Sequence, residues 1–503
     1  MRGAGESVVA SSVEEYGLFV NGKWVSPPGT SRFETINPTN REPVGSFVAA
    51  TPADVSRAVD AAQKAFPAWR DLPPPRRGQI LRDAARILRE RKAALGRIVT
   101  QEMGKILPEG LGDVQEAIDF VEYMDGEGRR LLGETVPSEL RAKFCLTVRQ
   151  PKGVVACITP WNFPTAIPNW KIAAALIAGN TVVFKPASST ARCAAEVVKV
   201  YEDAGLPPGV LNLVTGSGGT VGTALVEDPR VRAVSFTGGV ETGRDVYVRG
   251  AGRLKMVHLE LGGKNPQIVM DDANLPLALE GILFGAFGTS GQRCTATSRL
   301  VLHAPIYDRF LEMLVHRLES FRVGDPLAPG TDMGPVASAD QERKILQYIE
   351  IGRSEAHLVR GGEKLSGGIY DRGFFLAPTI FETHHGSRIS KEEIFGPVLS
   401  VIKVADYGEA VRVANDVDYG LSSSIYTRDV SRAFRAIEDL EAGITYINAP
   451  TIGAEIQLPF GGIKNTGNGG REAGTAAIEE FTEVKTVFVD YSDKLQKAQI
   501  DTA

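Results

Sequence analysis

Apolar and polar residues alternate with a helical period through the first part of the chain. A helix is predicted to begin at Thr51, because threonine caps helices, Pro52 suits the first turn and the Asp54 carboxylate can accept from free backbone N–H groups. A second helix is predicted over residues 76–100, after three consecutive prolines, since apolar residues return every three or four positions from Ile80 to Leu88. Both segments should bury one face and expose the other.

From Gly153 onward the pattern changes to short β-branched runs separated by helical segments. The runs lie at residues 154–158, 181–184, 211–214 and 233–236 and, after Glu260, at 267–270, 299–302, 399–404 and 443–447. Runs of this length that alternate with helices are typical of parallel βα units. The sequence therefore predicts an α/β protein with two α/β domains.

Two further segments, residues 145–150 and 486–491, have the character of strands but belong to neither series. Neither could bury both of its faces alone. We expect them to pair as a small sheet outside the main domains, which indicates an oligomer.

The composition is that of a large folded protein, with 503 residues, 43% of them hydrophobic and 23% charged. The net charge of −5 and the lack of a Lys/Arg cluster make nucleic acid an unexpected partner. No apolar run approaches the length of about 18 residues that spans a bilayer. Residues 1–14 also lack the apolar stretch of a secretory signal, so we expect no membrane partner and a cytoplasmic location.

The cysteines have neither the density of a disulfide scaffold nor the spacing of a zinc site, and no metal is expected. Cys145, Cys157 and Cys193 lie in apolar contexts that predict buried thiols. Cys294 differs because it closely follows the glycine turn at Gly291, where its side chain and its backbone N–H can both face a cleft. Taken alone, this pattern also fits a structural cysteine.

Two further polar residues, Glu260 and Asn162, could take part in catalysis. Glu260 ends an apolar run before two glycines, and burial there would raise its pKa toward the range of a general base. Its alternative is a carboxylate on a solvated rim. Asn162, between two prolines, could donate to an oxyanion, and its alternative is a cap on the next helix.

Two glycine turns, residues 216–222 and 236–243, each follow a predicted strand. Neither has the spacing of the usual dinucleotide fingerprint. The repeated order of strand, glycine turn and helix start nevertheless favours a bound dinucleotide.

Seven motifs carry a resemblance to a known family. In chain order they are PWNFP, FKPA, FTGG, ELGGKNP, GQRC, EEIFGPV and PFGGIKNTG, and together they span nearly the whole chain. As a set they resemble the aldehyde dehydrogenase superfamily. The resemblance implies a variant Rossmann domain (1–130 and 153–261), an α/β catalytic domain (262–475) and a small oligomerisation sheet (131–152 and 476–503) in a homodimer or homotetramer.

The resemblance also implies the chemistry. It assigns Cys294 as nucleophile, Glu260 as base, and Asn162 with the Cys294 backbone N–H as the oxyanion hole. A small-molecule aldehyde would be oxidised to a carboxylic acid with NADP or NAD, through a thiohemiacetal and a thioester that Glu260-activated water hydrolyses.

Carried over position by position, the resemblance names further site residues. The cofactor contacts would be Pro160, Trp161, Lys185, Ser188, Gly218, Gly238, Gly239, Gly243, Leu261, Glu393 and Phe395. The aldehyde tunnel would be lined by Phe163, Trp170, Arg293, Thr295 and Phe460, together with the loop 450–458. Lys171 and Glu472 match positions linked to proton exit, and an ordinary ion pair is their alternative.

Three positions bear on specificity. Ser188 stands where NAD-restricted members often have Glu, so a 2′-phosphate would not be repelled and NADP should be accepted. Val240 follows Gly239 where many members have Ser-Thr, so backbone N–H must replace one hydroxyl contact. Arg293 or the backbone at 453–454 could receive a substrate carboxylate, as the likeness of the 450–455 loop to bacterial semialdehyde dehydrogenases suggests, although Arg293 could instead point into the protein.

Two other functions stay open at this point. A coenzyme A-acylating relative would pass the thioester to coenzyme A, but its counterpart of Glu260 is usually not acidic. A non-enzymatic structural protein would be expected to lack the nucleophile or the base, and both are present. A classical alcohol or hydroxy-acid dehydrogenase is disfavoured, because the glycine turns do not fit its fingerprint and no zinc-ligand spacing occurs.

Overall fold

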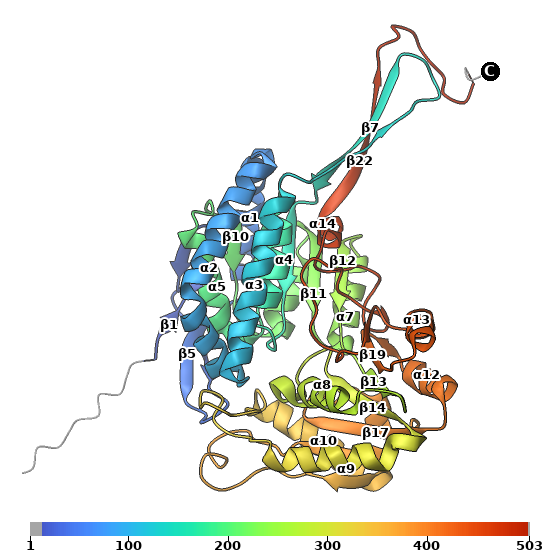
Figure 1. Cartoon of the computed structure of the whole chain (residues 1–503). Helices are drawn as coiled ribbons and strands as arrows, with labels where there is room; N and C mark the ends of the chain where they lie inside the picture. The colour runs from blue at the N-terminus through green and yellow to red at the C-terminus, as the bar shows by residue number, and fades with distance from the viewer. Residues whose placement is uncertain (1–12, 501–503) are drawn as a thin grey trace, which may run out of the picture.

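The computed structural model describes residues 13–500 of the chain. Residues 1–12 and 501–503 lie outside the described residues. The prediction that residues 1–14 carry no secretory signal therefore falls mostly outside the described part. The described part consists of two α/β bodies and a projecting arm (Figure 1). This arrangement confirms the predicted α/β class.

Three long helices open the first body. They are α1 (Pro52–Asp71), α2 (Pro74–Met103) and α3 (Leu107–Glu127). The predicted start of α1 is confirmed, since the Thr51 backbone N–H donates to Asp54 Oδ2 at 2.8 Å while the Thr51 hydroxyl accepts from the Asp54 N–H. α2 and α3 pack lengthwise on each other and on the helices beside the first sheet (Figure 1).

The first sheet has seven strands in the order β12-β11-β8-β9-β10-β2-β3. Its strands are β2 (Leu18–Val20), β3 (Lys23–Val25), β8 (Val154–Ile158), β9 (Thr181–Lys185), β10 (Leu211–Leu213), β11 (Val231–Thr237) and β12 (Met256–Glu260). The strands from β12 to β10 are parallel, and β2 and β3 are antiparallel. Both faces are buried: Val182 and Phe184 belong to one core and Val183 to the other. The helices between its strands are α4 (Ala166–Ile177), α5 (Ala191–Asp203), α6 (Thr223–Glu227) and α7 (Val240–Ala251).

The second sheet also has seven strands, in the order β15-β16-β17-β14-β13-β19-β20. Its strands are β13 (Asn265–Val269), β14 (Thr297–His303), β15 (His357–Arg360), β16 (Thr379–Thr383), β17 (Val398–Val404), β19 (Ser422–Tyr426) and β20 (Ile444–Ile447). Only β15 is antiparallel to its neighbour. The accompanying helices are α8 (Leu275–Phe287), α9 (Tyr307–Arg317), α10 (Ala339–Glu355), α11 (Arg388–Lys391), α12 (Tyr407–Asn415) and α13 (Val430–Asp439).

The arm joins two segments far apart in the chain. β7 (Lys143–Pro151) pairs antiparallel with β22 (Thr482–Asp490) along their whole length, and β6 (Thr135–Val136) adds to the other edge of β7. This confirms the predicted pairing. The arm projects away from both bodies (Figure 1) and leaves Phe144, Val484 and Phe488 exposed.

Smaller elements complete the chain. β1 (Glu15–Tyr16), β4 (Arg32–Ile36) and β5 (Pro43–Val48) form one small sheet, and β18 (Tyr419–Gly420) pairs with β21 (Ile463–Lys464). After β21 the chain returns to the first body, where Ile478 and Phe481 of α14 (Ala476–Phe481) enter its core. The strands of the three main sheets fall within the three predicted regions, whose boundaries stay a prediction.

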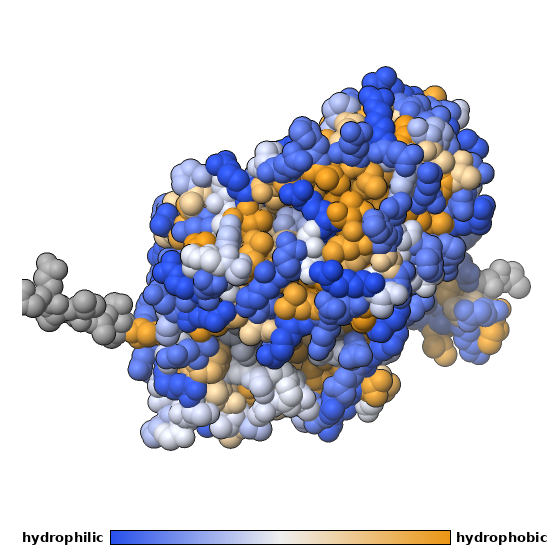
Figure 2. Space-filling view, turned by 90° about the horizontal axis from the view of Figure 1, so that it is seen from below, coloured by the Kyte–Doolittle hydropathy of each residue, from blue (hydrophilic) through white to orange (hydrophobic). Residues whose placement is uncertain are grey.

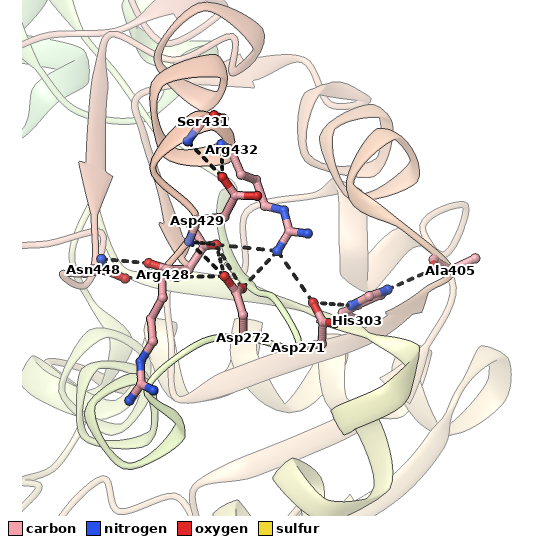
Figure 3. Close-up of polar contacts among 10 residues, drawn as sticks. Asp271, Asp272, His303, Ala405, Arg428, Asp429, Ser431, Arg432 and Asn448 are labelled. Atoms are coloured by element: carbon pink, nitrogen blue, oxygen red, sulfur yellow. Dashed lines mark hydrogen bonds and ion pairs between the residues drawn. The ribbon is translucent and has the colours of Figure 1, made fainter.

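A polar network fixes the start of α13 (Figure 3). The Asp272 carboxylate, just beyond β13, accepts from the backbone N–H groups of Arg428 and Asp429 at 2.9 and 2.8 Å and pairs with Arg432 at 2.9 Å. Asp429 in turn caps the helix. The outer face of the anchored helix carries exposed Val430, Phe434 and Ile437.

The surface holds further apolar patches. Figure 2 shows several among hydrophilic residues on the face seen from below in Figure 1. Among residues 13–500, no helix combines the length and the apolar character needed to cross a membrane.

Candidate active site

A cavity of about 700 Å³ lies at the carboxyl ends of strands β8, β9 and β11. Its wall comes mostly from the first body, and the second body contributes Cys294, Gln341, Lys344, Glu393 and Phe395. The predicted site residues on this wall are Pro160, Trp161, Asn162, Lys185, Gly218, Gly238, Gly239, Leu261, Cys294, Glu393 and Phe395. The structure therefore brings the nucleophile candidate and most cofactor candidates to one cavity.

Glycine backbone forms one side of this cavity. An ideal Cβ at Gly218, Gly219, Gly222 or Gly239 would have no atom within 4 Å, so these positions face open space that a ligand can fill. Gly239 is the N-cap of α7 and makes no side-chain cap, which leaves N–H groups at the helix start for an anion. These features fit the pyrophosphate of a dinucleotide.

Two charged side chains flank the glycine wall. Lys185 is 5% exposed, its Nζ donates to the Pro186 carbonyl at 2.8 Å, and burial lowers its pKa to about 8. The Glu393 carboxylate accepts from the Gly263 N–H at 3.0 Å, and burial raises its pKa. Both side chains have polar atoms that suit ribose hydroxyls.

Phe395 lines the same cavity as Glu393 and Cys294. It adopts a left-handed backbone with φ of 62°, and its ring meets the edge of Trp161 at a centroid distance of 5.4 Å. Such backbone strain is held only where the surroundings require it. The aromatic pair gives this part of the cavity an apolar wall.

Two predicted cofactor residues are not on the cavity wall. The Ser188 hydroxyl donates to the Gly216 carbonyl at 2.9 Å and so braces a glycine turn. Gly243 lies on the buried face of α7, where a Cβ would come within 2.4 Å of the Leu261 side chain. Both residues support the wall from behind.

The Cys294 thiol reaches the cavity because the preceding turn is sharply bent. Thr289, Ser290 and Gly291 all have positive φ angles of 53°, 55° and 69°. Burial, together with the nearby Glu260 and Glu393 carboxylates, raises the pKa of the Cys294 thiol to about 12. The group is therefore a neutral thiol before substrate binds. The other three cysteines are buried, as predicted.

Asn162 shares the cavity wall with Cys294. It is 3% exposed, and its Oδ1 has no hydrogen-bond partner among the residues described. The alternative of a helix cap is wrong, since Thr165 is the N-cap of α4. The side chain is thus a buried amide beside a thiol.

Glu260 is the last residue of β12 and is only 3% exposed, so the alternative of a solvated rim is wrong. Its carboxyl group does not line the cavity, and its Oε1 lies 3.6 Å from His258 Nε2. Gly461 approaches so closely that a Cβ there would be 2.5 Å from Oε1. Burial raises the pKa of Glu260 to about 7. In this retracted orientation the carboxylate must turn to reach a substrate.

The predicted tunnel residues lie outside the lining of the 700 Å³ cavity. Trp170 and Phe460 make an edge-on pair at 5.2 Å, and Thr451 of the 450–458 loop donates to the Thr295 carbonyl at 2.7 Å. The Phe163 ring contacts two cations, Lys105 and Arg293, at 3.7 and 5.5 Å.

Arg293 points into the protein, which is the alternative to its contact with a substrate carboxylate. Its guanidinium pairs with Glu109 at 2.8 Å and donates to the Thr289 hydroxyl at 2.9 Å. Only 11% of the side chain is exposed. The group is therefore already partnered before any substrate arrives.

Lys171 and Glu472 form a buried ion pair, and Lys171 also donates to the Ser235 hydroxyl at 2.9 Å. This contact fits both an ion pair and a proton relay. Two residues that were not expected from the sequence, His258 and Glu480, lie 2.9 Å apart beside the Lys171–Glu472 pair. A signal for His258 was present, because it precedes Glu260 by two residues and so shares its face of the strand.

The fold and the cavity together define a class: two α/β bodies around a cavity that a glycine-rich wall and a cysteine share. The sequence model of the aldehyde dehydrogenase family matches residues 24–487, and the chain belongs to this family.

Similar proteins agree with this assignment. The chain is 44% identical to the alpha-ketoglutaric semialdehyde dehydrogenase of Bacillus subtilis over 484 residues, 96% of this chain and 99% of the relative. It is 41% identical to a betaine aldehyde dehydrogenase of Mesorhizobium japonicum, with 94% and 97% covered. Among solved structures, the betaine aldehyde dehydrogenase of Staphylococcus aureus in complex with NAD+ superposes with a TM-score of 0.93 at 33% identity, covering 95% of this chain and 96% of that one.

Proposed function

We propose that the protein oxidises an aldehyde to a carboxylic acid through a covalent intermediate on Cys294, with NAD+ or NADP+ as the oxidant. One observation carries the proposal. The Cys294 thiol lies on the same cavity wall as the glycine turns, Glu393 and Phe395. A carbonyl bound there would meet both the nucleophile and the cofactor.

The first step needs a base, because the Cys294 thiol is neutral before substrate binds. Glu260 has a pKa near 7 and, turned toward the cavity, accepts the thiol proton. The sulfur bonds to the carbonyl carbon, and the oxygen becomes an oxyanion. The Asn162 amide and the Cys294 backbone N–H stabilise this oxyanion.

When bound, the nicotinamide cofactor supplies the oxidation of the thiohemiacetal carbon to a thioester. Glu260 releases the thiol proton, which accounts for the one net proton that the overall reaction gives to solvent, and then takes a proton from water, whose oxygen attacks the thioester carbon. The C–S bond breaks, the sulfur leaves with the electron pair, and the carboxylic acid is released. Because Glu260 is buried beside the thiol, hydrolysis is favoured over transfer to coenzyme A.

The test is a purified-protein assay with aliphatic, aromatic and ω-carboxylated aldehydes. We expect reduced nicotinamide and carboxylic acid in equal amounts without coenzyme A. Formation of an acyl-coenzyme A product would identify the acylating alternative. A panel that yields no reduced nicotinamide would favour the non-enzymatic one.

We propose that NADP is accepted at least as well as NAD. Ser188 adds no carboxylate near the cavity, and the buried Lys185 ammonium can pair with a 2′-phosphate. A solved Escherichia coli protein described as an NADP dependent enzyme superposes with a TM-score of 0.91 at 38% identity, with 95% of this chain and 98% of that one covered. A kcat/KM for NADP about tenfold or more below that for NAD would contradict the proposal.

We propose an ω-carboxylated semialdehyde as the substrate class. Three of the relatives at 41–44% identity are named for α-ketoglutarate semialdehyde or 2,5-dioxopentanoate, an aldehyde that carries a carboxylate. Arg293 directly precedes the nucleophile, and its pair with Glu109 can be exchanged for a substrate carboxylate.

Arg293→Met tests this role while it keeps an apolar contact to Phe163. We expect KM for the semialdehyde to rise about tenfold or more, since a charge-assisted contact of at least about 1.4 kcal/mol is lost. An uncharged aldehyde of similar length is the control, and its KM should hardly change. Equal losses for both aldehydes would assign Arg293 a purely structural role.

We further propose that the arm mediates assembly into a homodimer or homotetramer. Its exposed apolar residues, Phe144, Val484 and Phe488, lie on a two-segment sheet with no body behind it. Sedimentation equilibrium should give two or four chains, and Val484→Ser with Phe488→Ser should lower that number. A monomeric wild-type chain would contradict the proposal.

The predicted cytoplasmic location is checked by cell fractionation.

A further inference from the structure

Three buried carboxylates converge on one imidazole nitrogen behind the cavity. His258 Nε2 lies 2.9 Å from Glu480, 3.6 Å from Glu260 and 3.9 Å from Glu472. All four side chains are at most 6% exposed. Such a group of carboxylates cannot all be ionised in a buried site unless cations accompany them.

We propose that His258 is a positioning residue for the base Glu260: its imidazolium keeps the retracted Glu260 carboxylate ionised and passes the proton that Glu260 gains in each turnover to Glu480. The proposal rests on the proposed function, since it concerns the hydrolysis step. It is separate from the Lys171–Glu472 pair that the family resemblance links to proton exit.

The surroundings of the imidazole hold it in place. Gly470 packs so closely that a Cβ there would lie 1.9 Å from His258 Nδ1, so the ring cannot turn away. On the same strand, the Leu259 N–H donates to Asn468 Oδ1 at 3.0 Å, which fixes the glycine-rich loop against β12. The ring nitrogen therefore stays within 3.9 Å of the three carboxylates, although its N–H completes a hydrogen bond to none of them among the described residues.

The charges around His258 come from every element packed against it. Glu260 shares its strand, Glu480 comes from α14, Glu472 follows β21, and Lys171 comes from α4. The Cys157 thiol of β8, whose pKa burial raises to about 12, and the Ser235 hydroxyl of β11 are neutral. Three carboxylates thus face two cations, and without the imidazolium only Lys171 would remain.

The titration of His258 supports this assignment. Burial alone would lower its pKa, but the field of Glu480, with contacts to Glu260 and Glu472, raises the pKa to about 10. The ring is therefore cationic at neutral pH. Both oxygens of Glu260 and of Glu480 lack a hydrogen bond among the described residues, as does His258 Nε2, which lies 3.6 and 2.9 Å from the two carboxylates.

The proton transfer balances in two movements. His258 Nε2 gives its proton to the Glu480 carboxylate, and its freed lone pair accepts the proton from the Glu260 carboxylic acid. The result is an ionised Glu260, an unchanged imidazolium and a neutral Glu480. Glu480 releases this proton to solvent before the next turnover, and Glu260 is ready to act as a base again.

A metal ion is the competing interpretation of these groups. The ligand atoms of His258, Glu472 and Glu480 lie within 4.8 Å of one another. However, the Lys171 ammonium already pairs with Glu472 and would repel a cation. We therefore assign the cluster to protons.

The experiment compares His258→Gln, Glu480→Gln and the control His316→Asn, which alters an exposed histidine 3.1 Å from Glu319. Gln at 258 keeps an N–H donor near the position of Nε2 but removes the charge. The hydrolysis rate of the acyl-enzyme is followed by acid quench and intact mass across pH. The first-turnover formation of reduced nicotinamide is followed in parallel.

In the wild type, hydrolysis should fall as pH drops below about 7, where Glu260 becomes protonated. His258→Gln should raise the apparent pKa of hydrolysis by about one or more pH units, because a cation beside the carboxylate is lost. Glu480→Gln should lower the apparent pKa, because a neighbouring negative charge is lost, and should also slow hydrolysis at its high-pH plateau, because Gln cannot accept the proton. First-turnover nicotinamide formation should persist in both, and the control should match the wild type.

Unshifted pKa values in both variants, or shifts in the same direction, would overturn the proposal. If His258→Gln does not fold, the plateau hydrolysis rate of Glu480→Gln decides alone: an undiminished rate would overturn the proposal. Activity in the glutamine variants that depends on added Zn²⁺ or Mg²⁺ would instead support the metal interpretation. The absence of first-turnover nicotinamide formation in the wild type would refute the proposed function and this inference with it, whereas normal formation with unshifted hydrolysis would refute the inference alone.

Discussion

The two ends of the site use glycine in opposite ways. At the cofactor end, Gly218, Gly219 and Gly239 face open space, and the absent side chains leave room for a ligand. At the Glu260 end, Gly461 and Gly470 press against Glu260 and His258, and the absent side chains let backbone close over charged groups. One end is an open, backbone-lined wall, and the other is a sealed cluster of ionisable side chains.

This difference follows from what each end must do. A dinucleotide enters and leaves every cycle, so its site needs exposed N–H groups and space. A general base needs a pKa near the working pH, which burial among charged neighbours provides. The Cys294 thiol lies where the two ends meet.

The largest effect is expected from Cys294→Ala, which should abolish turnover while it leaves cofactor binding intact. Turnover should fall by about 10⁴-fold or more, because no covalent intermediate can form. Cofactor binding should survive, since the glycine wall is untouched. Steady-state rates and the fluorescence of bound reduced cofactor test both statements, and a variant that retains turnover would remove Cys294 from the mechanism.

Glu260→Gln should remove the general base at the sealed end and leave the cofactor end unchanged. Hydrolysis should slow by about 10²- to 10⁴-fold, the usual contribution of a general base. A stoichiometric burst of reduced nicotinamide at high pH should remain, because a fraction of the thiol ionises without help. Rapid-mixing absorbance measures the burst, and normal steady-state turnover would contradict the assignment of the base.

Asn162→Ala should weaken the stabilisation of the oxyanion beside Cys294, where the two ends of the site meet. Loss of an oxyanion donor is expected to lower kcat about 100-fold or more, or about 3 kcal/mol. Unlike Glu260→Gln, it should slow the burst as well as turnover, since both steps pass through an oxyanion. A near-normal kcat would exclude Asn162 from the oxyanion hole.

A matched pair of glycine variants tests the comparison directly and should have the smallest effects. Gly239→Ala places a methyl in the open cavity and should raise the cofactor KM about tenfold, with the free energy of unfolding changed by less than about 0.5 kcal/mol. Gly470→Ala forces a methyl against the imidazole and should cost about 1–3 kcal/mol of stability. Thermal unfolding and cofactor kinetics distinguish them, and equal profiles would contradict the contrast.

Much of the fold was predictable because local patterns determine it. The cap at Thr51 and the strand at residues 154–158 were predicted correctly from turn chemistry and β-branched runs. The arm pairing of β7 with β22 was also predictable, since neither strand can bury both faces alone. By contrast, the return of α14 into the first body depends on packing between segments far apart in the chain.

The site divides in the same way. Asn162 and Cys294 stand in turns whose residues direct them outward, so their meeting in one cavity could be expected. Glu480 carried no signal, because it reaches His258 only after α14 packs against the first body, 222 residues further along the chain.

The sequence by itself determined the elements, the family and the reactive groups, because helix caps, strand runs and motif residues act over a few neighbouring positions. Only the tertiary structure decided the orientation of those groups: Glu260 turned toward His258, Arg293 paired with Glu109, and Ser188 braced against Gly216. Each of these states depends on the burial and charge of partners distant in the chain. Electrostatic and packing energies at such contacts exist only once the chain has folded.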